Sequence, residues 1–133
     1  MTANLLVVDD DPDSRDVVAR YLAREGYSVK SAANGREALV AVATTIPDLI
    51  ILDAMMPEMS GVEFLQVIRS YLRWSTVPVI LLTAFAEGPH IDRAREFDVR
   101  QIFLKANYKL SDLAACVRRL LDDPNSDCIG AAG

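Results

Sequence analysis

The feature that most constrains this sequence is a run of four apolar residues, Leu49–Leu52, that ends directly in one carboxylate, Asp53. An unbroken apolar run of this length, bounded by turn residues, is typical of a strand that is buried on both faces of a sheet. Met56-Pro57 interrupts the chain three residues later. Ser60-Gly61 then begins a predicted helix, whose apolar stripe consists of Phe64, Leu65, Ile68, Tyr71 and Leu72. The pattern therefore predicts a parallel strand with Asp53 at its carboxyl end, the edge where open α/β sheets place their ligands.

Four further apolar segments alternate with helical patterns along the chain. The expected strands are Leu5–Val8, Tyr27–Ala32, Leu49–Leu52, Val77–Leu82 and Ile102–Leu104, and the expected helices begin at Pro12, Asn34 and Ser60 and cover residues 87–97 and 110–121. Strands that alternate with helices pair in parallel and place helices on both faces of the sheet. We therefore expect an α/β fold of the flavodoxin-like, doubly wound type, with five parallel strands in the order 2-1-3-4-5.

Residues that favour helix ends support these boundaries. Asp11 precedes Pro12, an arrangement typical of a helix cap followed by proline at the first helical position. Asn34 with Glu37, and Ser60 with Glu63, have the spacing of a capping box. We therefore interpret Asp11 as a helix cap and not as a ligand.

Length, charge and cysteine usage narrow the class of protein. The chain has 133 residues, 51% of them hydrophobic, which suits one domain over residues 4–121, with residues 122–133 as a tail or the start of a linker. A net charge of −5 argues against direct nucleic acid binding by this chain. No apolar run is long enough for a membrane span, and no basic signal-peptide start precedes Leu5. We expect a cytoplasmic protein that makes no membrane contact, with Cys116 and Cys128 as reduced thiols.

Polar side chains follow four of the five predicted strands. Because parallel strands all end at the same edge of a sheet, we expect these side chains to lie close together. They are Asp9 and Asp10 after the first strand, Asp53 after the third, Thr83 after the fourth and Lys105 after the fifth. Oxygen ligands without histidine or cysteine favour Mg²⁺ or Mn²⁺. A lysine and a hydroxyl suit the remaining oxygens of a phosphoryl group. Asp53, alone on the middle strand, is the expected nucleophile, which would form an aspartyl phosphate.

The segments LLVVDDD, LIILDAMMPEMSG, VPVILLTA and IFLK resemble the receiver domain of two-component response regulators over residues 4–121. The resemblance implies that Asp53 accepts a phosphoryl group from a sensor histidine kinase or a histidine phosphotransfer protein. It implies that Asp9, Asp10, Asp53 and the backbone carbonyl of Met55 hold Mg²⁺.

The same resemblance assigns roles to the two remaining site residues. Lys105 would contact the phosphoryl group, and Thr83 would move toward it. Thr83 would thereby couple phosphorylation to a downstream target on the face formed by residues 87–97, 102–104 and 110–121. A protein of this kind is not an enzyme in the ordinary sense, because it catalyses only its own phosphoryl transfer and autodephosphorylation.

The chain departs from the pattern of the family it resembles at three places. The lysine is followed by Ala106 and not by the usual proline in a cis peptide, which makes a cis bond costly here. Ile102 stands where the family usually has an aromatic residue, while the adjacent Phe103 is expected to point to the opposite face. Met55 and Phe85 are bulky and apolar beside the site. We expect them to hinder the hydrolytic water and prolong the life of the aspartyl phosphate.

Two other functions remain open from the residues alone. A Mg²⁺-dependent phosphatase with an aspartyl nucleophile usually carries a second aspartate two residues further on, and here that position is Met55. A receiver-like interaction module that signals without phosphorylation is the stronger alternative, because Ile102 and Ala106 alter the part of the chain that would report phosphorylation.

Overall fold

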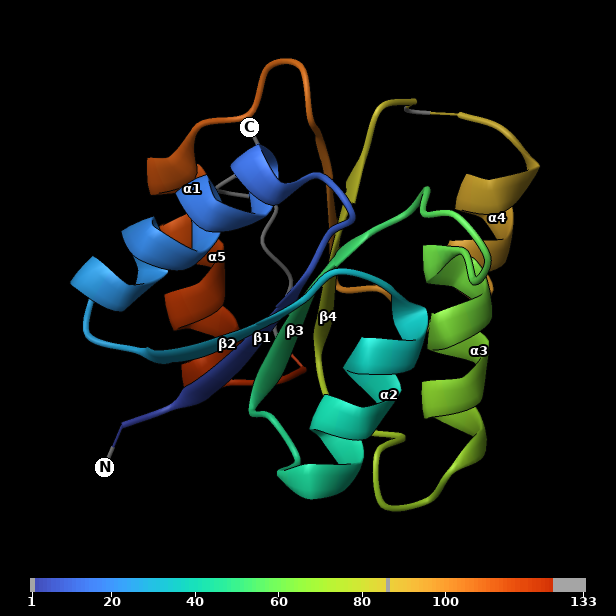
Figure 1. Ribbon diagram of the computed structural model, residues 1–133, viewed down its shortest axis with the longest axis horizontal. Helices are drawn as coiled ribbons and strands as arrows, with labels where there is room; N and C mark the ends of the chain where they lie inside the picture. The colour runs from blue at the N-terminus through green and yellow to red at the C-terminus, as the bar shows by residue number, and fades with distance from the viewer. Residues whose placement is uncertain (1, 86, 126–133) are drawn as a thin grey trace.

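The computed structural model describes residues 2–85 and 87–125, which form five strands and five helices in strict alternation (Figure 1). In chain order they are β1 (Asn4–Val8), α1 (Pro12–Arg24), β2 (Ser28–Ala32), α2 (Gly35–Thr44), β3 (Leu49–Asp53), α3 (Gly61–Ser70), β4 (Val79–Thr83), α4 (Pro89–Glu96), β5 (Gln101–Leu104) and α5 (Leu110–Asp122). The strands are all parallel and lie in the order β2-β1-β3-β4-β5. This arrangement confirms the predicted doubly wound sheet and its strand order.

The sheet separates two hydrophobic clusters. Helices α2, α3 and α4 cover one face and α1 and α5 cover the other (Figure 1). In β3, Ile50 and Leu52 belong to the first cluster, while Leu49 and Ile51 belong to the second. All four are 0% exposed, which confirms that this run is a strand buried on both faces. Asp53 therefore lies at the end of a strand that is buried along its whole length.

Side-chain caps fix the starts of the first three helices as predicted. Asp11 accepts a hydrogen bond from the backbone N–H of Asp13 at 3.2 Å. Asn34 accepts one from the N–H of Glu37 at 2.9 Å. Ser60 and Glu63 form a complete capping box. These caps set where α1 and α3 begin relative to the strand ends before them.

The region between α3 and β4 differs from the sequence expectation. We expected Tyr71 and Leu72 to continue the helical apolar stripe, but α3 ends at Ser70 and these side chains are 54% and 91% exposed. Tyr71 instead packs against Trp74, with ring centroids 4.7 Å apart. Strand β4 begins two residues later than predicted, after Pro78, whose nitrogen cannot donate to a sheet.

The structure also bears on the expected state of the cysteines and on the expectation that no segment spans a membrane. Cys116 lies in α5 with 0% exposure and is disulfide-bonded, which corrects the expectation of a reduced thiol at this position. Cys128 lies outside the described residues. Among the helices that the structure describes, none has the length and apolar character needed to cross a bilayer.

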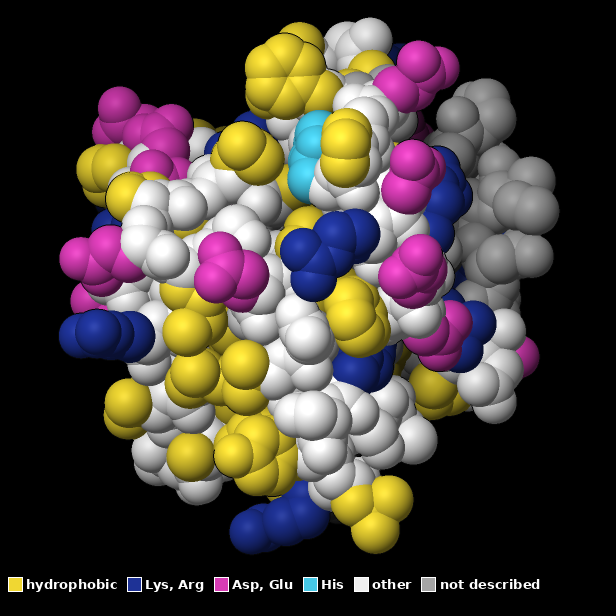
Figure 2. Space-filling model, turned by 90° about the vertical axis from the view of Figure 1, so that its right-hand side faces the viewer, with side chains coloured by type: hydrophobic (Ala, Val, Ile, Leu, Met, Phe, Trp, Pro, Cys, Tyr) yellow, Lys and Arg dark blue, Asp and Glu magenta, His cyan; other side chains and the backbone are white. Residues whose placement is uncertain are grey.

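The side of the molecule formed by α3 and α4 carries a mixed surface. Hydrophobic, basic and acidic side chains are interspersed over it (Figure 2). This face therefore presents no single sign of charge to a partner.

Candidate functional site

The ends of β1, β3, β4 and β5 bring five polar side chains to one edge of the sheet. Asp9 and Asp10 directly follow β1, Asp53 and Thr83 are the last residues of β3 and β4, and Lys105 directly follows β5. Backbone bonds extend the sheet through these positions. The N–H of Asp9 donates to the carbonyl of Ala32 at 3.1 Å, and the N–H of Lys105 donates to that of Thr83 at 2.8 Å. The backbones of Asp9 and Lys105 are thus held by bonds to the neighbouring strands.

Three carboxylates gather at this edge. One carboxylate oxygen from each of Asp9, Asp10 and Asp53 lies within 4.8 Å of the others. Asp9 is 1% exposed and Asp53 is 3% exposed, whereas Asp10 is open to solvent. Like charges this close repel by about 4 kcal/mol per pair at an effective dielectric constant near 20. The cluster therefore needs a compensating positive charge.

Lys105 supplies part of that charge. Its Nζ lies 3.0 Å from Oδ2 of Asp9 and 3.4 Å from Oδ2 of Asp53. Burial by itself would lower the pKa of Lys105, but the hydrogen bond and charge of Asp9, together with Asp53, raise the pKa above its ordinary value. The ammonium therefore stays protonated and bridges the two buried carboxylates.

One lysine does not fully offset the negative charge on Asp53. Burial, followed by the charge of Asp9, raises the pKa of Asp53 from 3.8 to about 7, although Lys105 and the N–H of Met55 act in the opposite direction. That N–H donates to Oδ1 of Asp53 at 3.3 Å. Oδ2 of Asp9 is buried and has no hydrogen-bond donor among the described residues beyond the Lys105 ion pair. Excess buried carboxylate oxygen of this kind fits a hard divalent cation.

One residue that no sequence pattern singled out, Arg15, helps to shape the site. Arg15 donates from Nη1 to the backbone carbonyl of Asp9 at 2.8 Å and so fixes the end of β1 to the first turns of α1. Its position was readable in principle, because side chains on a helix lean toward the helix N-terminus.

Gly61 permits the close approach of α3 to the end of β3. Its N–H donates to the carbonyl of Ala54 at 3.0 Å. A Cβ at this position would run into the carbonyl oxygen of Asp53 and lie 2.9 Å from Cα of Ala54. These neighbours are backbone atoms that cannot turn away. Glycine at the first position of α3 is therefore required to place the backbone of Asp53.

Thr83 is bound to the loop that follows it. The side chain is 0% exposed, and its hydroxyl donates to the carbonyl of Phe85 at 3.1 Å and accepts from the N–H of Phe85 at 3.2 Å. The ring of Phe85 is 60% exposed and meets the ring of His90 edge-on, with centroids 6.3 Å apart. Thr83 is thus connected through Phe85 to the first turn of α4.

The structure also shows which way Ile102 and Phe103 of β5 point and which isomer the peptide bond after Lys105 adopts. Ile102 packs on the cluster under α2, α3 and α4, while Phe103 is buried in the cluster under α1 and α5, which confirms that they face opposite ways. The bond between Lys105 and Ala106 is trans, like every peptide bond of the described residues. The backbone after Lys105 therefore adopts its path without a cis proline.

The fold is that of an α/β domain. At one edge of its sheet lies an acidic site, formed by Asp9, Asp10 and Asp53, that could hold a metal ion beside Lys105. The chain belongs to the response regulator receiver domain family, which matches residues 5–118. It therefore belongs to the proteins of two-component signalling.

Individual relatives agree with this assignment. The response regulator MprA of Mycolicibacterium vanbaalenii is 37% identical over 122 residues, 91% of this chain and 51% of that protein. The signal receiver domain of a histidine kinase from Syntrophus aciditrophicus has a TM-score of 0.84 at 32% identity, covering 95% of this chain and 96% of that chain. The chemotaxis protein CheY4 of Vibrio cholerae has a TM-score of 0.83 at 29% identity, covering 90% and 98%. The chain spans about half the length of MprA.

Proposed function

We propose that this chain is a phosphorylation-dependent signalling receiver in which Asp53 accepts a phosphoryl group in a Mg²⁺-dependent reaction. The observation that carries the proposal is the packing of Asp9, Asp10 and Asp53 within 4.8 Å of one another, with Lys105 bridging two of them. Asp9, Asp10, Asp53 and the backbone carbonyl of Met55 would hold Mg²⁺, or Mn²⁺ in its place. When bound, the ion would neutralise the negative charge on the phosphoryl oxygens.

The transfer follows from the position of Asp53 at the end of the buried β3. A carboxylate oxygen of Asp53 attacks phosphorus in line, and the P–N bond of a partner's phosphohistidine breaks. The imidazole nitrogen leaves with the bonding electrons and takes up a proton from solvent. Lys105, which the carboxylates keep protonated, is free to turn from Asp53 to the transferred phosphoryl oxygens. Thr83 donates its hydroxyl to another of these oxygens.

The proposed partners follow from this chemistry. The donor is a sensor histidine kinase or a histidine phosphotransfer protein in the cytoplasm, and a downstream target binds the face formed by α4, β5 and α5. The net charge of −5 favours protein partners over direct contact with nucleic acid or an acidic membrane surface. The chain would catalyse only its own phosphorylation and autodephosphorylation, without turnover of a separate substrate.

A second candidate is a receiver-like module that binds its partner without phosphorylation. Ile102 is the observation that favours it, because an aliphatic residue on this face of β5 lacks the ring that would report on Thr83. The two candidates differ in whether Asp53 is ever modified.

Incubation of the whole chain with acetyl phosphate and Mg²⁺, followed by intact mass, tests the proposal. We expect the addition of one phosphate, its loss when the metal is chelated, and its loss in Asp53→Ala. The matched control is Asp16→Ala, an exposed carboxylate on α1 that should leave the modification unchanged. An unmodified wild-type chain would favour the phosphorylation-independent module, and steady release of phosphate over many turnovers would favour a phosphatase.

A further inference from the structure

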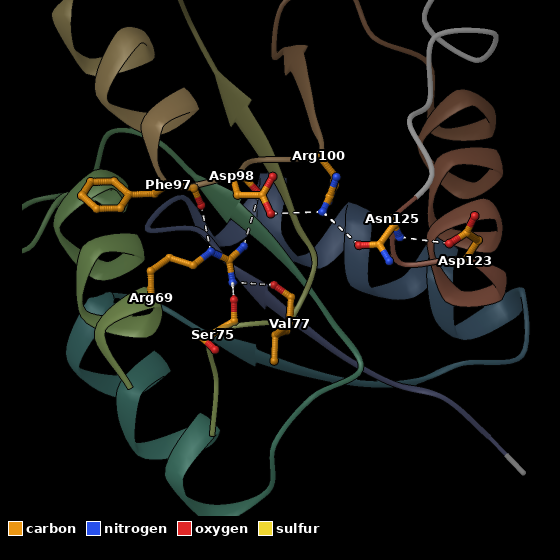
Figure 3. Close-up of polar contacts among 8 residues, drawn as sticks. All are labelled: Arg69, Ser75, Val77, Phe97, Asp98, Arg100, Asp123 and Asn125. Carbon is orange, nitrogen blue, oxygen red and sulfur yellow. Dashed lines mark hydrogen bonds and ion pairs between the residues drawn. The ribbon is translucent and has the colours of Figure 1, made fainter. Parts of the chain in front are cut away.

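Arg69 joins three separate segments at the end of the molecule opposite the acidic site. It lies in the last turn of α3 and donates from Nε to the carbonyl of Phe97 at 2.8 Å. Its Nη1 donates to the carbonyls of Ser75 at 3.1 Å and Val77 at 2.7 Å (Figure 3). Burial lowers the pKa of the Arg69 guanidinium. A charged group is stable here because carbonyl oxygens surround it.

The same guanidinium reaches the turn between α4 and β5. Nη2 of Arg69 donates to the carbonyl of Asp98 at 3.4 Å. Asp98 has φ of 62°, a left-handed conformation that is unfavourable for residues with a Cβ. Its carboxylate accepts from Nη2 of Arg100 at 3.0 Å. Arg69 thus anchors the backbone of the turn, while the Asp98 side chain of the same turn binds a second arginine, Arg100.

Arg100 connects this turn to the segment that follows α5. Its Nη2 also donates to Oδ1 of Asn125 at 3.4 Å (Figure 3). The N–H of Asn125 in turn donates to Oδ1 of Asp123, the residue that caps the end of α5. The Arg100 side chain is 24% exposed and that of Asp98 is 64% exposed. The connection is therefore near the surface and weak enough to open.

We propose that Asp98 and Arg100 form a latch that holds residues 123–125 against the turn between α4 and β5, with Arg69 as the residue that positions the turn. A displacement of the C-terminal end of α4 would then change the position of the chain as it leaves α5. This coupling goes beyond the proposed phosphorylation of Asp53 and does not depend on it. It gives the domain a physical route from α4 to any segment that follows residue 125.

NMR of the whole, unphosphorylated chain tests whether the latch forms. The readouts are the backbone ¹⁵N–¹H resonance of Asn125 and its heteronuclear NOE. Arg100→Gln and Asp98→Asn should each lower the NOE and shift the resonance. Arg100→Gln removes the donor to Asn125, and Asp98→Asn removes the charge that holds the Arg100 side chain in place. Asparagine tolerates the left-handed backbone, so Asp98→Asn keeps the turn. The control is Arg20→Gln, which removes the exposed ion pair of Arg20 and Asp16 on α1. An Asn125 signal in Arg100→Gln equal to the wild type would overturn the latch.

A double-variant comparison tests the coupling itself. Arg69→Lys, which does not touch Asn125 directly, should shift the Asn125 resonance, and the exposed Arg73→Lys should not. The effect of Arg69→Lys should disappear in the Arg100→Gln background. Persistence of the full effect in that background would contradict transmission through Arg100. If Arg69→Lys does not fold, Asp98→Asn takes its place in the comparison. The effect of Asp98→Asn on the Asn125 resonance should likewise vanish in the Arg100→Gln background. Exposed ion pairs are weak, so the latched population should change by about fivefold or less.

Discussion

The hydroxyl of Thr83 and the backbone of Phe85 are joined by two hydrogen bonds, one in each direction, at 3.1 and 3.2 Å. If Thr83 is to donate its hydroxyl to a phosphoryl group on Asp53, the bond that it donates to the carbonyl of Phe85 must break, because the hydroxyl has one proton. Release of Phe85 would free its ring from His90 at the start of α4. The loop after β4 is therefore the first part of the chain that should respond to phosphorylation.

Thr83→Val should separate phosphorylation from this response. Valine keeps the shape of the side chain but leaves the N–H of Phe85 without its partner, so the free energy of unfolding should fall by about 1–2 kcal/mol. The amide resonance of Phe85 should no longer move when acetyl phosphate and Mg²⁺ are added, while intact mass still records the modification. Thr83→Ser, which retains the hydroxyl, is the control. A wild-type shift of Phe85 in Thr83→Val would show that the hydroxyl does not carry the response.

Met55 should lengthen the life of the phosphorylated state. Its side chain is 51% exposed two residues after Asp53, where an apolar group obstructs the approach of water. Met55→Asn should therefore dephosphorylate at least about twofold faster than the wild type, because a polar side chain can hold and orient water there. Decay of the phosphorylated mass after removal of acetyl phosphate gives the rate, and Met55→Leu should match the wild type. A wild type that decays faster than Met55→Asn would contradict this role.

The raised pKa of Asp53 predicts how stability depends on pH without metal. The folded state keeps a proton on this carboxyl up to about pH 7, whereas the unfolded chain releases it near 3.8. The contribution of Asp53 to the free energy of unfolding should therefore fall as pH rises from about 4 to about 7. Urea unfolding of the wild type and Asp53→Asn, compared over this range, isolates the contribution.

Saturating Mg²⁺ supplies the control for this pH effect. Because the ion favours the ionised carboxylate, it should remove the fall in stability of the wild type between about pH 4 and 7. A difference between the wild type and Asp53→Asn that stays constant with pH in chelator would contradict the raised pKa.

Gly61→Ala should be strongly destabilising. The added Cβ would meet the backbone of Asp53 and Ala54, so α3 must move away from β3, and we expect a loss of about 2–4 kcal/mol in urea unfolding. Gly35→Ala is the comparison, because Gly35 also begins a helix, but its added Cβ would meet side-chain atoms of Met59 and no backbone atom, so we expect a smaller loss. Equal losses in the two variants would show that the contact with β3 is not the cause.

The sequence was sufficient for the parts of the fold that depend on local patterns. The apolar run before Asp53, the caps at Asn34 and Ser60, and the alternation of strands and helices each act over a few residues, and each was confirmed. The convergence of Asp9, Asp53 and Lys105 also followed, because parallel strands end at one edge.

The remaining features depend on contacts between distant residues. The periodicity of Tyr71 and Leu72 favoured a longer α3, but both side chains are exposed, and the ring of Tyr71 packs against Trp74 in the segment after the helix. The role of Arg69 requires carbonyls from residues six to twenty-nine positions away, which no local spacing reveals. The binding of Thr83 to the backbone of Phe85 depends on the path of a loop. Such features need the folded chain.

Chemical trapping at Asp53 tests the central claim most directly. The chain is treated with acetyl phosphate and Mg²⁺, reduced with borohydride, which converts an aspartyl phosphate to homoserine, and digested for peptide sequencing by mass spectrometry. We predict homoserine at position 53, with unchanged aspartate at Asp9 and Asp10 in the same sample. Homoserine at either of those positions, or unmodified aspartate at position 53, would contradict the assignment of Asp53 as the phosphoryl acceptor.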